Sequence, residues 1–145
     1  MEVLCWDIPS RFRWLGVIDA ALQEIGQELD WDSEDLNKIA IALIEAVSNA
    51  IEHGNEFESG QRVRVEAHLS SERLNFTVSD EGRGFDRTLL TVPPIPPDDP
   101  RFLNSRGRGI FIMRDIMDKV ETDQDADGRF RVKLEKRIKS SEIAD

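Results

Sequence analysis

A chain of 145 residues, 39% hydrophobic and 33% charged, is long enough to form one domain with a buried two-layer core. Its net charge of −10 repels phosphate backbones, so direct nucleic-acid binding is not expected. No apolar run approaches the roughly 20 residues that cross a bilayer, and no basic region precedes an apolar N-terminal segment. A single cysteine, Cys5, excludes an internal disulfide. We therefore expect a cytoplasmic protein without a membrane partner.

The first third of the chain predicts one strand and two helices. Residues 2–8 form the expected strand, which Pro9 ends. Ser10 is placed to cap a helix that runs to about Leu29. After a break at residues 31–35, Asp32 or Ser33 would cap a second helix, and the two acidic residues that follow suit its positive end.

The second helix is predicted to end at Gly54, a candidate left-handed cap, and it carries two contrasting faces. At about 100° per residue, one face is apolar. The opposite face carries Glu45, Asn49 and Glu52. Ile41 flanks this polar stripe, so the stripe resembles a pocket wall more than an ordinary solvated surface. The apolar face consists of Leu36, Ile39, Leu43, Val47 and Ala50.

Two alternating strands follow at residues 62–69 and 74–79. Asp80 continues the inward-facing series of the second strand. A carboxylate that faces a core is costly unless something pairs with it, which is a second sign of a pocket. An aspartate that caps a turn is the simpler alternative.

The last third predicts a loop, a helix and a hairpin. Residues 91–100 hold five of the six prolines and exclude a helix or a central strand. A third helix is expected to open at residues 106–109, followed by strands at 120–124 and 130–134. The predicted fold is an α+β two-layer sandwich, with three helices on one face of a mixed, mostly antiparallel sheet. It comprises one domain, residues 1–137, and a polar tail, residues 138–145.

The polar residues and glycines together suit a bound nucleotide. Asn49 offers a neutral oxygen to Mg²⁺, and Glu45 could accept a proton from an attacking hydroxyl. An inward Asp80 could accept a hydrogen bond from an exocyclic amine such as that of adenine. The pair Gly107 and Gly109 allows backbone amides at a helix start to receive phosphate oxygens. Taken singly, each feature also fits a solvated helix face or an ordinary turn.

Three motifs in this order resemble those of the histidine-kinase-like ATPase superfamily. Residues 45–54, EAVSNAIEHG, resemble its N box, and residues 80–86, DEGRGFD, resemble its first glycine box. Residues 106–113, RGRGIFIM, resemble the second glycine box in the form typical of anti-sigma-factor serine kinases. Together the motifs fall within residues 39–120, most of the predicted domain.

The resemblance implies a role for each matching residue. It makes Glu45 the catalytic base and Asn49 the magnesium ligand. It assigns the adenine end of the pocket to Asp80, Gly82 and Gly84.

At the phosphate end, the resemblance places Gly107 and Gly109 beside the phosphates and makes residues 91–105 the ATP lid. Arg106 and Arg108 are both candidates for a contact with the γ-phosphate, and the sequence does not choose between them.

The expected function is that of an ATP- and Mg²⁺-dependent protein-serine kinase. The resemblance implies a serine of an anti-anti-sigma protein as the acceptor, a sigma factor as a further partner, and a homodimer. An ATP-gated binding module without phosphotransfer is the alternative, and the presence of Glu45 disfavours it. A sensor histidine kinase is disfavoured because only 38 residues precede residue 39.

Overall fold

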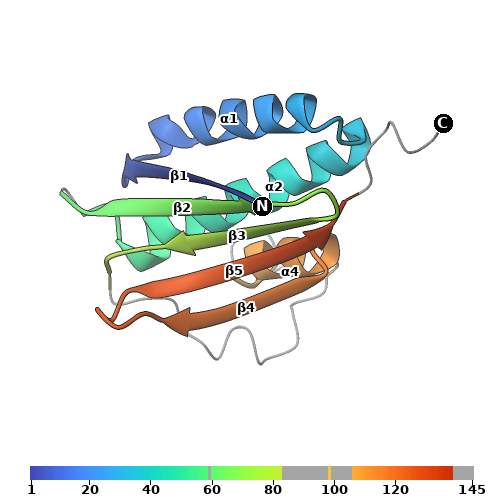
Figure 1. Cartoon of the computed structure of the whole chain (residues 1–145). Helices are drawn as coiled ribbons and strands as arrows, with labels where there is room; N and C mark the ends of the chain where they lie inside the picture. The colour runs from blue at the N-terminus through green and yellow to red at the C-terminus, as the bar shows by residue number, and fades with distance from the viewer. Residues whose placement is uncertain (59, 83–97, 99–105, 139–145) are drawn as a thin grey trace.

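A five-stranded antiparallel sheet forms one layer of the molecule, and three helices cover one of its faces (Figure 1). The computed structural model describes residues 1–58, 60–82, 98 and 106–138. The strand order is β1-β2-β3-β5-β4. All four pairings are antiparallel, whereas the sequence predicted a mixed sheet that is mostly antiparallel. The strands are β1 (Glu2–Pro9), β2 (Arg62–Leu69), β3 (Arg73–Ser79), β4 (Lys119–Gln124) and β5 (Phe130–Arg137).

The three central strands, β2, β3 and β5, bury one face of the sheet by alternation. Val65, Val78 and Val132 are paired across β2, β3 and β5, and all three lie in the hydrophobic core. Because every second residue points to the same face, the polar residues between them remain on the outer face. Phe76, in the middle of β3, is fully buried. The alternation predicted for residues 62–69 and 74–79 is confirmed.

The three helices lie side by side, with α2 in contact with both of the others. The predicted apolar face of α2 is confirmed, because all five of its residues are buried. Among the described residues, no helix is long and apolar enough to cross a membrane. The helical elements are η1 (Phe12–Trp14), α1 (Leu15–Glu28), α2 (Ser33–Asn49), η2 (Ala50–Gly54) and α4 (Arg106–Ile116).

Two predicted helix starts have different outcomes. Asp32 caps α2 as expected, since its Oδ1 accepts hydrogen bonds from the backbone N–H groups of Glu34 and Asp35 at 2.9 and 3.4 Å. The prediction that Ser10 caps the first helix is wrong. The chain passes through the 3₁₀ turn η1 before α1 begins, and the buried Ser10 Oγ instead accepts a hydrogen bond from Asn55.

The end of the second helix also differs from the prediction. Beyond Asn49 the helix widens into one π turn, η2, closed by the Asn55 N–H donating to the Ala50 carbonyl over 2.8 Å. Gly54 does not adopt a left-handed φ, so it is not the predicted cap. Such π turns occur often at functional sites, because one extra residue per turn redirects the side chains that follow.

The C-terminal end of the fold closes on the sheet. Ile138, directly after β5, is buried, and its N–H donates to the Glu72 carbonyl. The remainder of the predicted tail, residues 139–145, lies outside the described residues.

Candidate nucleotide-binding site

Glu45 and Asn49 lie one turn apart on α2, as their spacing predicts. Asn49 is 7% exposed, and its buried Nδ2 has no hydrogen-bond partner among the residues that the structure describes. A buried donor left unpaired costs roughly 1–3 kcal/mol. The carboxamide is therefore placed to bind something outside the polypeptide, either a phosphate oxygen through its nitrogen or a cation through its oxygen.

The first turn of α4 packs directly against these two side chains. A methyl group added at Gly109 would lie 2.7 Å from Asn49 Nδ2 and 3.2 Å from Glu45 Oε2. Only a glycine allows the backbone of α4 to come this close. The structure thus brings Glu45, Asn49 and Gly109 together, although 60 residues separate the last two in the sequence.

The start of α4 agrees with the helix opening predicted at residues 106–109. The helix begins at Arg106, so Gly107 and Gly109 belong to its first turn. The first N–H groups of a helix have no partner within the helix, and they attract anions. The side chains of residues 106–108 are outside the described part of the structure, and the choice between Arg106 and Arg108 stays open.

Just beyond the C-terminal end of α2, beside Gly54, Asp80 extends the line of β3 into the core. Its N–H donates to the Phe130 carbonyl at 3.1 Å, which continues the β3–β5 pairing by one residue. The side chain is 3% exposed, as the inward phase predicted. Within the described residues its one hydrogen-bond donor is the Gly82 N–H, 3.0 Å from Oδ1. Burial raises the pKa of Asp80 to about 6, and the Gly82 bond opposes that rise.

Two glycines make room for this carboxylate. A methyl group added at Gly54 would overlap the Asp80 carboxyl group, and one added at Gly82 would overlap the Gly54 carbonyl. Gly54 is therefore required for space and not for a left-handed backbone. Sequence reasoning missed this role, although the inward-facing Asp80 already implied a close neighbour.

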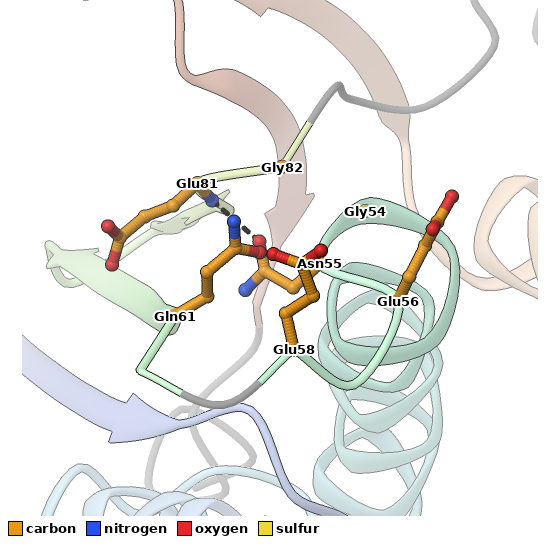
Figure 2. Close-up of a pocket in the computed structure, with 7 residues that line it drawn as sticks. All are labelled: Gly54, Asn55, Glu56, Glu58, Gln61, Glu81 and Gly82. Atoms are coloured by element: carbon orange, nitrogen blue, oxygen red, sulfur yellow. Dashed lines mark hydrogen bonds between the residues drawn. The ribbon is translucent and has the colours of Figure 1, made fainter.

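A cavity of about 390 Å³ opens beside this pair of glycines (Figure 2). It lies between the loop that follows η2 and the end of β3. Three of the residues around it are glutamates, so cations and hydrogen-bond donors are its favoured ligands. The cavity is bordered by Gly54, Asn55, Glu56, Glu58, Gln61, Glu81 and Gly82.

Asn49 and Gly54 are five residues apart, which is about 7 Å along a helix axis. The site therefore has one end at Glu45, Asn49 and Gly109 and another at Gly54, Asp80 and Gly82. Gly84 and the predicted lid, apart from Asp98, lie outside the described residues. In the described part of the chain, no group of three or more His, Cys, Asp or Glu side chains could hold a metal ion.

Comparison with known proteins matches residues 8–136 to the histidine kinase-like ATPase domain. The chain belongs to this family. The name of this domain implies that ATP is its nucleotide. The resemblance of the three motifs is thereby confirmed.

Two relatives illustrate the similarity in sequence. The chain is 28% identical to the serine-protein kinase RsbW of Halalkalibacterium halodurans over 128 residues, covering 86% of this chain and 78% of the relative. It is 31% identical to the anti-sigma F factor of Clostridium perfringens over 111 residues, covering 77% and 79% of the two chains.

Solved structures support the fold. The RsbU and RsbW domains of a Mycobacterium tuberculosis protein match with a TM-score of 0.67 at 21% identity, covering 95% of this chain and 33% of that one. The SiaB–SiaC complex of Pseudomonas aeruginosa matches with a TM-score of 0.62 at 15% identity, covering 93% and 89%. At these identities the likeness concerns the fold alone.

The buried Asp80 should make the nucleotide-free protein less stable as the pH rises. Its pKa in the folded state, about 6, exceeds the ordinary value of 3.8, so the folded state keeps a proton that the unfolded state has lost. Stability is therefore lost between about pH 4 and pH 6. Asp80→Asn, which stays uncharged, should be more stable than the wild type by about 1–3 kcal/mol at pH 7.5 and equally stable near pH 3.5.

Urea unfolding at both pH values measures this difference. Asp127→Asn is a matched control, because Asp127 is exposed in the β4–β5 turn and should change stability by less than about 0.5 kcal/mol. Equal pH slopes for the wild type and Asp80→Asn would contradict the prediction.

A methyl group at Gly109 should disturb the phosphate end of the site. We expect Gly109→Ala to separate α4 from α2, reduce ATP affinity at least tenfold and lower stability by about 1–3 kcal/mol. Gly16→Ala is the control, since nothing lies within 4 Å of the added methyl and a helical alanine gains up to about 1 kcal/mol. Calorimetric ATP titration and thermal unfolding measure both effects, and an unchanged ATP affinity in Gly109→Ala would refute this packing.

Proposed function

We propose that the protein is an anti-sigma-type protein-serine kinase, which transfers the γ-phosphate of ATP to a serine of a partner protein. The observation that carries the proposal is the meeting of Glu45, Asn49 and the α4 backbone at Gly109, within an ATPase fold. The relatives named serine-protein kinase and anti-sigma F factor support this function over those of other members of the family.

The base would bind at the Asp80 end of the site. The exocyclic amine of adenine is a donor, and the buried Asp80 carboxylate is an acceptor that, among the described residues, accepts from the Gly82 N–H alone. Gly82 lets the chain pack against the Gly54 carbonyl on that side. Gly84 belongs to this end by its resemblance to the family's first glycine box.

The phosphates would bind between α2 and the N-terminal turn of α4. The Asn49 Oδ1 is a neutral oxygen that would bind Mg²⁺, which would neutralise phosphate charge and take its remaining ligands from water and phosphate. The Asn49 Nδ2, which has no partner among the described residues, would donate to a phosphate oxygen. Gly107 and Gly109 would present backbone N–H groups, and Arg106 or Arg108 would contact the γ-phosphate. Residues 91–105 would cover the nucleotide as a lid.

The chemical step needs positioning and one proton acceptor. The serine Oγ bonds to the γ-phosphorus as the bond from that phosphorus to the bridging oxygen of ADP breaks. Glu45, half-buried beside Asn49, takes the proton of the serine hydroxyl. The products are phosphoserine, ADP and a protonated Glu45.

The partner that fits this function is an anti-anti-sigma protein that supplies the serine. A sigma factor would be a second partner, and a homodimer is the expected assembly. The alternative is an ATP-gated module that binds its partner without phosphotransfer. Glu45 favours the kinase, because a module that only binds has no use for a base.

Glu45 should be needed for phosphotransfer and not for ATP binding. Loss of the general base in Glu45→Ala should lower the rate by about 10²–10⁴-fold with ATP affinity within threefold of the wild type. Glu52→Ala serves as the control, because this carboxylate is exposed and lies about two turns beyond Glu45, and it should retain the rate. Transfer of label from γ-labelled ATP to a serine of the proteins encoded beside this one measures the reaction.

A wild type that forms an ATP-dependent complex but never labels a serine would favour the binding module.

Asn49 should be needed for binding Mg-ATP. Asn49→Ala removes the buried carboxamide, and we expect at least a hundredfold loss of affinity by calorimetry in the presence of Mg²⁺. Asn49→Asp keeps an oxygen ligand and should retain more affinity than the alanine variant. An unchanged affinity in Asn49→Ala would remove the nucleotide site from this part of the helix.

A further inference from the structure

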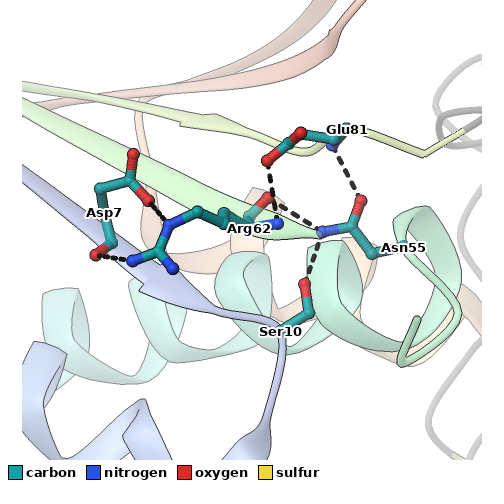
Figure 3. A network of polar contacts seen from close by, with 5 residues as sticks. All are labelled: Asp7, Ser10, Asn55, Arg62 and Glu81. Carbon is teal, nitrogen blue, oxygen red and sulfur yellow. Dashed lines mark hydrogen bonds and ion pairs between the residues drawn. The ribbon is translucent and has the colours of Figure 1, made fainter. Parts of the chain in front are cut away.

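Asn55 is buried, and its carboxamide makes hydrogen bonds in three directions (Figure 3). Its Nδ2 donates to Ser10 Oγ at 2.5 Å and to the Arg62 carbonyl at 3.0 Å. Its Oδ1 accepts from the Glu81 N–H at 2.8 Å. Asn55 is 1% exposed, so these bonds are shielded from water.

These bonds join four segments that are distant in sequence. Ser10 follows β1, Asn55 follows η2, Arg62 begins β2 and Glu81 follows β3. A second link reinforces the junction, since the Arg62 N–H donates to Glu81 Oε1 at 2.9 Å. The Arg62 guanidinium in turn contacts Asp7 on β1, through an ion pair with its carboxylate and a 3.0 Å bond to its carbonyl.

The bond to Glu81 lies between the two residues that shape the base end of the site. Asp80 precedes Glu81, and Gly82 follows it. Gly54, against which the Asp80 carboxyl group packs, directly precedes Asn55. Because no described side chain bonds to Asp80, its position depends on the backbone that carries it. The Asn55–Glu81 bond joins the two backbone segments that meet at Asp80.

We propose that Asn55 is a positioning residue for base selection, which holds the Asp80 carboxylate against Gly54 through its hydrogen bond to the Glu81 N–H. The inference rests on the proposed ATP site. A fixed carboxylate accepts from the amine of adenine and repels the carbonyl oxygen that guanine has at the same place. A carboxylate that is free to shift would lose the hydrogen bond to adenine and would repel the guanine carbonyl oxygen less strongly.

Two variants separate this role from simple stabilisation. Asn55→Ala removes all three bonds, whereas Asn55→Asp keeps an acceptor for the Glu81 N–H and loses the donor to Ser10 and Arg62. We expect Asn55→Ala to reduce the ratio of ATP to GTP affinity at least tenfold. Asn55→Asp should keep the ratio within threefold of the wild type, even though both variants unfold at lower urea concentrations.

Calorimetric titration of each variant with ATP and with GTP, in Mg²⁺, measures the ratio. Leu69→Ala is the control for lost stability, because Leu69 is buried at the opposite end of β2 from Arg62. It should unfold more readily and keep the wild-type ratio. A ratio that falls with stability in all three variants, or that stays unchanged in Asn55→Ala, would overturn the inference.

Hydrogen exchange in the wild type provides a second measurement that does not require the variants to fold. In the nucleotide-free protein, the Glu81 amide should exchange at least a hundredfold more slowly than the same amide in an unstructured peptide. Exchange at the rate of the unstructured peptide would overturn the inference.

The outcome for the proposed function is separate. A wild type that binds neither nucleotide contradicts the ATP site itself, whereas normal ATP selectivity in Asn55→Ala contradicts only the role of Asn55.

Discussion

The packing of the Asp80 carboxyl group against the backbone of Gly54 is the contact on which the rest of the site depends. It joins the end of β3 to the end of the second helix, and it requires that neither Gly54 nor Gly82 carry a side chain. The π turn η2 brings Gly54 to this position, because it inserts one residue before the chain leaves the helix. The sheet and the helix layer thus meet at the Asp80 carboxylate, a charged group whose burial in an apolar core costs free energy.

The last turn of α2, directly before η2, follows a similar principle. Asn49 is buried under the first turn of α4, where the absence of a side chain at Gly109 lets the two helices approach. At both places a glycine backbone lies against a polar side chain from another element. The helix α2 is consequently both the centre of the hydrophobic layer, through Ile39, Leu43 and Val47, and the scaffold of the site.

Much of this arrangement could be predicted from the sequence, because periodicity reports burial. The alternation in β2 and β3 gave the inward direction of Asp80, and the helical spacing gave the shared face of Glu45 and Asn49. The cap at Asp32 also followed from local chemistry. The three motifs, taken in order, were sufficient for the family.

What escaped prediction depends on contacts between distant segments. Ser10 has the chemistry of a helix cap, yet its hydroxyl bonds to Asn55, 45 residues away. Gly54 has the position of a left-handed cap, but its requirement is steric and comes from Asp80. No local pattern distinguishes an Asn in a loop from one that joins four segments. These features became visible only once the strand order placed β1, β2 and β3 side by side.

The unpaired Nδ2 of Asn49 has a consequence for the stability of the whole fold. Among the described residues this donor has no acceptor, so the fold is less stable until a bound ligand supplies one. A ligand at a hundred times its dissociation constant adds about 2.7 kcal/mol to stability by mass action. That is a large share of the roughly 5–15 kcal/mol that holds a domain together. The nucleotide concentration would then control the stability of the folded protein as well as its activity.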